Sequence, residues 1–199
     1  MKYFFGKAFF AVVYLMLSVI TGIAAISFSN KVMGLKIGLG VMNILVYAYF
    51  VFYYAMKTGE DAVKTRHAND VTRREIIRTG KDLEVKRNEE YKGWKGFFIG
   101  ALSCIPLVVL WIIHFIIVLA TGKTATFVGG IAITLYVVIA FFFNTDVKFM
   151  SFASSFYFTA LYVPFVVLLT GFGYLLGAKM QMKRQAKIEE YQRQFSEDI

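Results

Sequence analysis

The chain has 199 residues, of which 58% are hydrophobic, 18% are aromatic and only 18% are charged. Soluble globular domains are roughly 45–50% apolar and about 25% charged, so this composition leaves too little polar surface for a water-soluble domain of this size. The formal net charge of +9 does not indicate nucleic-acid binding, because much of the charge is dispersed as single lysines at the ends of apolar segments. We therefore expect an all-α, polytopic integral membrane helical bundle.

Residues 1–56 are predicted to form an N-terminal hairpin of two spanning helices. Lys2 and Lys7 precede an apolar run that begins at Ala8. That run is about twenty residues long, whereas the core of a signal peptide has about 7–15, so a retained span is favoured over a cleaved signal peptide. The second span is predicted at 36–56, and its later half is rich in tyrosine, as the aromatic belt at a membrane interface predicts.

Residues 57–95 form the one long polar block, which holds 11 of the 22 basic and 8 of the 13 acidic residues. We expect a cytosolic loop with one short amphipathic helix of about two turns, because Thr72 to Glu75 matches a capping box and Gly80 is a suitable stop. The block is long for a mere connection. The candidate residues for docking a partner protein are Arg73, Arg74, Arg78 and Trp94. The alternatives are a solvated charged surface and a contact with anionic lipid.

The membrane helices of the C-terminal half are predicted within residues 96–178. Three apolar segments occur there, at 96–120, 127–143 and 149–178, and a polar helical tail follows at 179–199. Pro106 predicts a kink in the first of these segments, which neighbouring helices can accommodate. The chain thus holds about five apolar helical segments, of which at least four are expected to span the membrane.

The positive-inside rule sets the expected orientation. Placing the N-terminus, the block 57–95 and the tail in the cytoplasm puts 18 of the 22 Lys and Arg on that side. This arrangement needs an even number of crossings after residue 95, whereas three apolar segments follow. We therefore favour one re-entrant or non-spanning segment, either 127–143 or the region 151–155, over a tail on the outside. The expected location is a bacterial plasma membrane.

Small and polar residues in the apolar segments suggest helix contacts. Three pairs match the small-xxx-small pattern that lets helix backbones approach closely, and they are the candidate helix-packing residues Gly34, Gly38, Gly96, Gly100, Gly173 and Gly177. Asn43 and His114 are the candidate intramembrane polar residues. Either they hydrogen-bond a neighbouring helix or they line a cavity. Cys104 is about 15 Å from His114 along one helix, too far to share a metal, and we expect no metal and no cofactor.

The composition and motifs favour a non-enzymatic membrane protein. Our first hypothesis is an accessory or assembly subunit that contacts membrane lipid and docks a protein partner, or a second copy, through the loop 57–95. The alternative is a small-molecule binding or transport component that uses Asn43 and His114. A lipid-modifying enzyme is the least favoured, because the apolar segments carry no paired acids, histidine-rich ligand set or nucleophile with its base.

Overall fold

The computed structural model describes residues 3–14, 17, 33–122 and 159–197, and these residues form helices joined by irregular segments. No strand occurs in these ranges. The elements in chain order are an N-terminal helix Tyr3–Tyr14, α2 Met33–Thr79, η1 Arg87–Glu89, α3 Lys95–Ser103, α4 Ile105–Thr121, η2 Thr159–Leu161 and α8 Tyr162–Glu197. The expected all-α class is thereby confirmed for the described residues.

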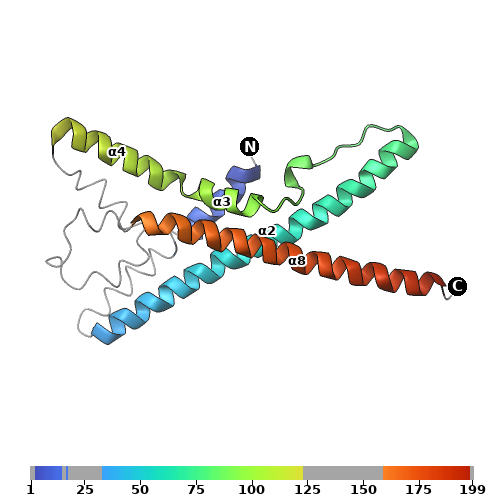
Figure 1. Ribbon diagram of the computed structural model, residues 1–199, viewed down its shortest axis with the longest axis horizontal. Helices are drawn as coiled ribbons and strands as arrows, with labels where there is room; N and C mark the ends of the chain where they lie inside the picture. Colours follow the sequence, from blue (N-terminus) through green and yellow to red (C-terminus); the bar gives the residue numbers. More distant parts are fainter. Residues whose placement is uncertain (1–2, 15–16, 18–32, 123–158, 198–199) are drawn as a thin grey trace.

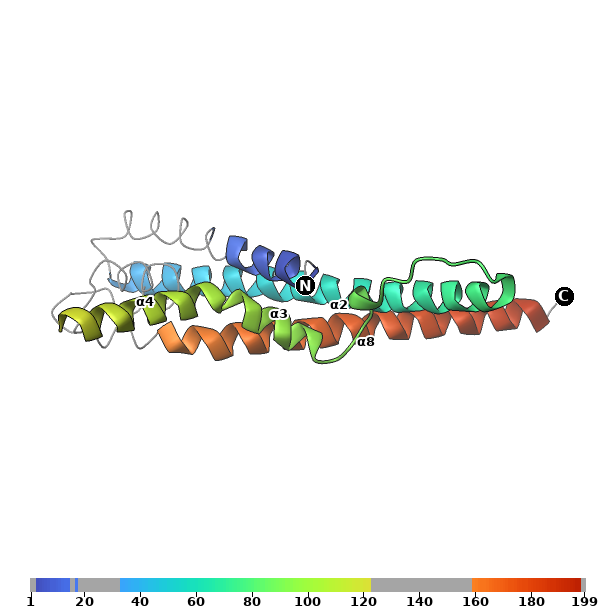
Figure 2. The same ribbon diagram turned by 90° about the horizontal axis from the view of Figure 1, so that it is seen from above.

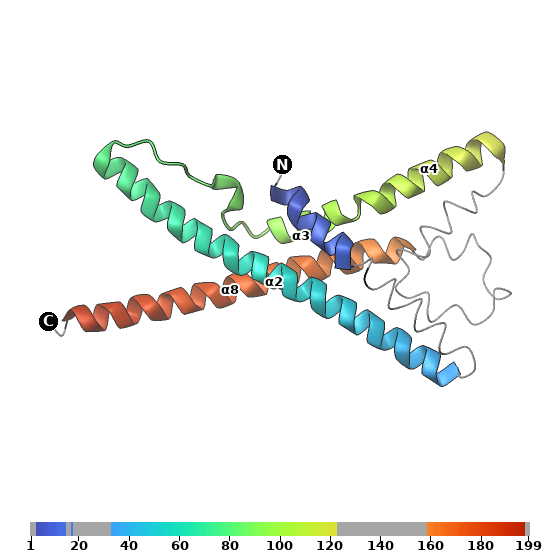
Figure 3. The ribbon, with the colours of Figure 1, turned by 180° about the vertical axis from the view of Figure 1, so that it is seen from behind.

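Two long helices, α2 and α8, cross near their middles and organise the molecule (Figure 1). α2 has 47 residues and α8 has 36, which correspond to about 70 Å and 54 Å of helix. Both helices begin on the same side of the crossing and end on the other, as the view from behind in Figure 3 also shows. Their apolar first parts therefore share one end of the molecule, and their polar last parts share the opposite end.

The remaining helices pack around this crossing. Figure 2 shows α8 on one face of α2 and the N-terminal helix on the other. The main buried cluster joins α2, α4 and the start of α8, and it consists of Tyr47, Val51, Cys104, Leu107, Tyr162 and Val166. Within it the hydroxyl groups of Tyr47 and Tyr162 lie 3.0 Å apart in a hydrogen bond. Away from this cluster α4 diverges from both long helices (Figure 1).

The predicted kink at Pro106 is present as a break between α3 and α4 at Cys104. The amide of Cys104 donates to the carbonyl of Ala101 at 3.1 Å, a tighter turn than an α-helix makes. Pro106 lies in the first turn of α4, where its missing N–H costs nothing. The amide of Val108 then resumes the α-helical pattern by donating to the carbonyl of Cys104.

The polar block differs from its predicted structure. Residues 57–79 continue α2 without interruption, in place of a separate helix of about two turns. Thr72 does not cap a helix, because its hydroxyl donates to the carbonyl of Ala68 at 3.0 Å within the same helix. Gly80 does end the helix, with a φ of 67° that residues with a side chain rarely adopt. The remaining residues return as a loop to α3 (Figure 3).

Within the described residues two helical stretches are long and apolar enough to cross a membrane, Lys95–Thr121 and Tyr162–Gln194. Only 17% and 39% of their most apolar windows are buried, whereas the core helix of a soluble protein is mostly buried. The arrangement of about five segments stays a prediction. The candidate re-entrant segments, 127–143 and 151–155, lie outside the described residues.

Candidate functional site

The crossing of α2 and α8 is made by glycines that face the backbone of the other helix. A Cβ atom added at Gly59 would lie 2.0 Å from the carbonyl oxygen of Tyr174, and one added at Gly177 would lie 1.9 Å from that of Met56. A Cβ atom added at Gly173 would lie 2.8 Å from the carbonyl oxygen of Phe52. Two helices can approach this closely only where side chains are missing, so these glycines set the geometry of the crossing.

The short helix α3 packs on α8 in the same way. A Cβ atom at Gly96 would lie 2.5 Å from that of Tyr174, and one at Gly100 would lie 2.1 Å from the hydroxyl oxygen of Thr170. Four of the six glycines singled out in the sequence thus lie at close helix contacts. Gly38 has no atom within 4 Å of its added Cβ, and the surroundings of Gly34 lie outside the described part of the structure.

A buried acid connects α2 to α8 just beyond the glycine crossing. The side chain of Glu60 is 3% exposed and accepts a 3.0 Å bond from the amine of Lys57, while the guanidinium of Arg184 on α8 lies 3.9 Å from its other oxygen. The hydrogen bond to Glu60 raises the pKa of the Lys57 amine above its usual value. The charge of the buried carboxylate is therefore compensated by one half-exposed cation from each helix.

The part of α2 beyond the crossing, residues 57–79, is here named the arm, and the loop after it is fastened along one side of it. Asn69, which is 5% exposed, donates to a carboxylate oxygen of Glu90 at 2.8 Å. Arg73 bonds the same oxygen of Glu90 and also the carboxylate of Asp70, at 2.8 Å. The amide of Tyr91 donates to the carbonyl of Ala62 at 3.1 Å. The loop therefore occupies one face of the arm.

The opposite face of the arm carries two arginines that pair with no acid in the described part of the chain. His67, Val71, Arg74 and Arg78 follow one another at intervals of four, three and four residues, which places them on one side of a helix. All four are exposed, and Val71 is 53% exposed. We name these four residues the outer face. In the described part of the chain neither arginine forms an ion pair. Ile77, beside this face near the tip, is 85% exposed.

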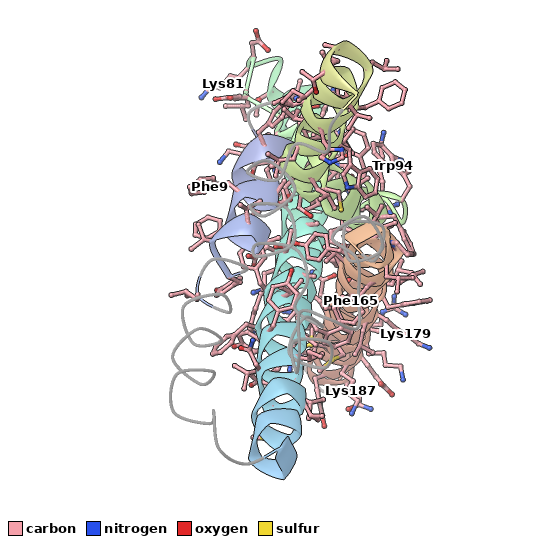
Figure 4. The ribbon with its side chains drawn as sticks, turned by 90° about the vertical axis from the view of Figure 1, so that its left-hand side faces the viewer. Phe9, Lys81, Trp94, Phe165, Lys179 and Lys187 are labelled. Carbon is pink, nitrogen blue, oxygen red and sulfur yellow. The ribbon has the colours of Figure 1, made fainter. Side chains whose placement is uncertain are left out.

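The four predicted docking residues thus lie on three different surfaces. Arg74 and Arg78 belong to the outer face, whereas Arg73 is engaged in fastening the loop. Trp94 stacks on Phe4 of the N-terminal helix, with ring centres 6.1 Å apart, and remains 53% exposed. In Figure 4 the labelled side chains of Lys81 and Trp94 point to opposite sides of the molecule.

Lys95, next to Trp94, is a buried cation that sequence reasoning missed. It is 2% exposed, and its amine donates to the backbone carbonyls of Asn88, at 2.7 Å, and of Glu90. The amine also lies 5.6 Å from the centre of the Phe4 ring and 5.9 Å from that of Tyr3. Lys95 therefore ties the end of the loop to the N-terminal helix. The only sequence signal was the aromatic cluster on either side of it.

The two candidate intramembrane polar residues are not brought together by the described residues. Asn43 is half-buried in the first part of α2, and His114 is half-buried in α4. These parts of α2 and α4 diverge from each other in Figure 1. Each residue takes part in an interaction. Across the described ranges no group of three or more His, Cys, Asp and Glu side chains gathers as a metal site would require.

Comparison of the chain with known protein families, with curated proteins and with solved structures finds no match. The possible role of the protein therefore rests on its own residues. Among them the outer face of the arm combines exposure, positive charge that pairs with no acid of the described residues, and an apolar side chain on one continuous helix. It is the best-defined candidate for a functional surface.

Proposed function

We propose that this protein is a non-enzymatic integral membrane subunit that docks a soluble partner on the outer face of its arm. The observation that carries the proposal is the continuity of α2, whose helix runs from an apolar stretch into an arm without a break. A surface on such a helix is held at a fixed place relative to the membrane. The proposal keeps the docking role expected from the sequence and assigns it to the outer face.

The membrane placement is supported by the apolar surfaces of the helices. Large apolar side chains are exposed along α4, among them Ile112, Phe115, Ile116 and Leu119. In water such a surface would be an aggregation hazard, whereas lipid tails would cover it. The polar ends of α2 and α8 then emerge on one side of the membrane. This fits the orientation expected from the distribution of Lys and Arg.

The arm is suited to docking because it is both long and stiffened. Its 23 residues, 57–79 of α2, correspond to about 35 Å of helix. The loop fastened by Glu90 and the ion pair of Glu60 with Arg184 hold it at its middle and at its base. A preorganised surface loses little conformational entropy on binding, and so it favours affinity.

The chemistry of the outer face indicates an acidic partner surface with an apolar depression. Arg74 and Arg78 present two charges about one helical turn apart, and Arg is common among the residues that dominate binding at interfaces. Val71 and Ile77 add apolar surface beside these charges. A carboxylate-bearing surface would pair with the two guanidinium groups in a bidentate manner.

In-cell photo-crosslinking tests the proposal. A photo-reactive residue replaces Ile77, beside the outer face, or, as a control, the exposed Asp61 on another side of the arm. We expect one discrete crosslinked protein from position 77 and none from position 61. Arg74→Glu with Arg78→Glu should weaken this crosslink on the order of a hundredfold, because like charges would then face each other.

The charge control reverses two cations that lie off the outer face. Lys81→Glu with Arg87→Glu makes the same change of net charge in the loop, where both residues are exposed, and should leave the crosslink intact. Equal loss in both double variants would contradict a specific docking surface. A product with twice the mass of this chain would show that the occupant is a second copy.

A further inference from the structure

The tail of α8 has its charges separated along the helix. Residues 179–187 contain four cations and no acid. Residues 188–197, the rest of the helix, contain three acids and a single cation, Arg193. The basic part follows directly on the apolar part of α8, which ends at the buried Ala178. The positive charge is therefore concentrated next to the proposed membrane surface, and the negative charge lies farther out.

Three of the four cations form one stripe. Lys179, Lys183 and Lys187 are four residues apart and so lie on one side of the helix, here named the lysine stripe. All three are exposed, and in the described part of the chain none of them forms an ion pair. Figure 4 shows Lys179 and Lys187 on the same side of α8, away from Phe9 of the N-terminal helix. The fourth cation, Arg184, is directed to Glu60.

On the membrane placement proposed above, the lysine stripe falls at the depth of the lipid headgroups. With a rise of about 1.5 Å per residue, the three lysines begin about 2, 8 and 14 Å beyond Ala178 along the axis. The headgroup layer on each side of a bilayer is about 5–8 Å thick, and charges act over a further 8–10 Å at physiological salt. The flexible stems of these lysines let their amines reach back toward the phosphates.

We infer that the lysine stripe binds the headgroups of anionic lipids in the leaflet from which α8 emerges. The inference rests on the membrane placement proposed above and adds a lipid class to it. A second copy is a poor occupant, because two copies in one membrane hold their tails parallel and would bring lysine against lysine. The acidic outer end of the tail is repelled by the same lipids, and this repulsion directs the tail away from the surface.

Lipid retention by the full chain tests the inference. The protein is reconstituted in phosphatidylcholine vesicles with about 30% phosphatidylglycerol, extracted in mild detergent, and analysed for the phosphatidylglycerol bound per chain at low and high salt. Each lysine near an anionic surface strengthens binding roughly fivefold. Replacing all three, as Lys179→Gln, Lys183→Gln and Lys187→Gln, should therefore weaken apparent phosphatidylglycerol affinity on the order of a hundredfold.

The matched control replaces three exposed lysines elsewhere, as Lys64→Gln, Lys81→Gln and Lys86→Gln, with the same loss of charge. It should retain phosphatidylglycerol within about threefold of the parent. Equal retention of phosphatidylglycerol in all three proteins would overturn the inference. So would the finding that the three lysines bind an acidic protein or a nucleic acid in place of lipid. A parent chain that fails to insert even into neutral vesicles would overturn the membrane placement itself. Insertion without a preference for phosphatidylglycerol would overturn only the lipid binding.

Discussion

Replacing Gly177 by alanine should separate the two long helices. The added Cβ atom would lie 1.9 Å from the carbonyl oxygen of Met56 and 2.9 Å from its Cα atom. Backbone atoms cannot rotate away as the end of a side chain can. Ordinary contact begins at about 3.4 Å, so the helices would have to move apart by about 1.5 Å at the crossing.

Two effects contribute to the free-energy cost of this movement. Overpacking a well-packed contact costs about 1–3 kcal/mol. A gap of only about 0.5–1 Å forfeits a quarter to a half of the dispersion energy of each contact it opens, and Gly59 and Gly173 share the crossing with Gly177. Against these losses stands the helix propensity of alanine, which gains up to about 1 kcal/mol over glycine. We expect a net loss of about 2 kcal/mol.

Gly38→Ala, in the other long helix α2, is the matched control, because nothing lies within 4 Å of the Cβ that it adds. It should leave stability unchanged or raise it by up to about 1 kcal/mol. Reversible unfolding in mixed detergent micelles, followed by the circular dichroism of the helices, measures both variants. Equal stabilities for Gly177→Ala and Gly38→Ala would refute the close crossing of α2 and α8.

Three further experiments, with four substitutions between them, test separate parts of the structure. Lys57→Met and Arg184→Met should each have little effect on stability, since both cations are half-exposed. Together they should destabilise the protein by more than the sum of the single changes, because the buried acid between them would lose both partners. A double-mutant cycle by detergent unfolding measures the excess, and simple additivity would contradict it. Glu90→Ala should release the loop and speed hydrogen exchange at the Tyr91 amide by roughly tenfold, the equivalent of a lost buried hydrogen bond of about 1.4 kcal/mol, and unchanged exchange would exclude the fastening. Gly122→Ala should cost about 1 kcal/mol in the same unfolding assay despite the open space around it, because its φ is 65°. A variant as stable as the parent would show that a side chain is not strained in this backbone conformation.

Local structure could be predicted from the sequence where a single residue type has one physical outcome. A proline inside an apolar run removes a helix hydrogen bond, and α4 duly begins beside Pro106. A glycine after a run of helix formers favours a left-handed turn, and Gly80 supplies it. The small-xxx-small pairs indicated which surfaces could approach closely, although the pattern alone does not say which helices meet.

The continuity of α2 could not be predicted because local signals compete within the polar block. Thr72 to Glu75 resembles a helix start, yet a threonine hydroxyl can also bond the carbonyl four residues back, as it does here. Gly59 looks like a helix breaker, but its missing side chain is what α8 requires. Ion pairs three residues apart, such as Lys57 with Glu60, then support the helix.

The outer face was only partly predictable for a similar reason. Sequence spacing puts Arg74 and Arg78 on one side of a helix, but only if the helix is known to run through both. Arg73 is the same residue type as Arg74 and directly precedes it, yet it pairs with Glu90, 17 residues later. Such long-range pairs depend on the path of the loop, which no local pattern specifies.

The side of the membrane reached by the two polar ends can be measured directly. Single cysteines at Thr79 on α2 and Ala186 on α8, both exposed, are treated with a membrane-impermeant thiol reagent, while the native Cys104 is 2% exposed and gives little background. We expect neither position to react in intact cells and both to react once the membrane is permeabilised. Reaction of only one position in intact cells would contradict the shared emergence of α2 and α8, and reaction of both would reverse the orientation on which docking to a cytosolic partner depends.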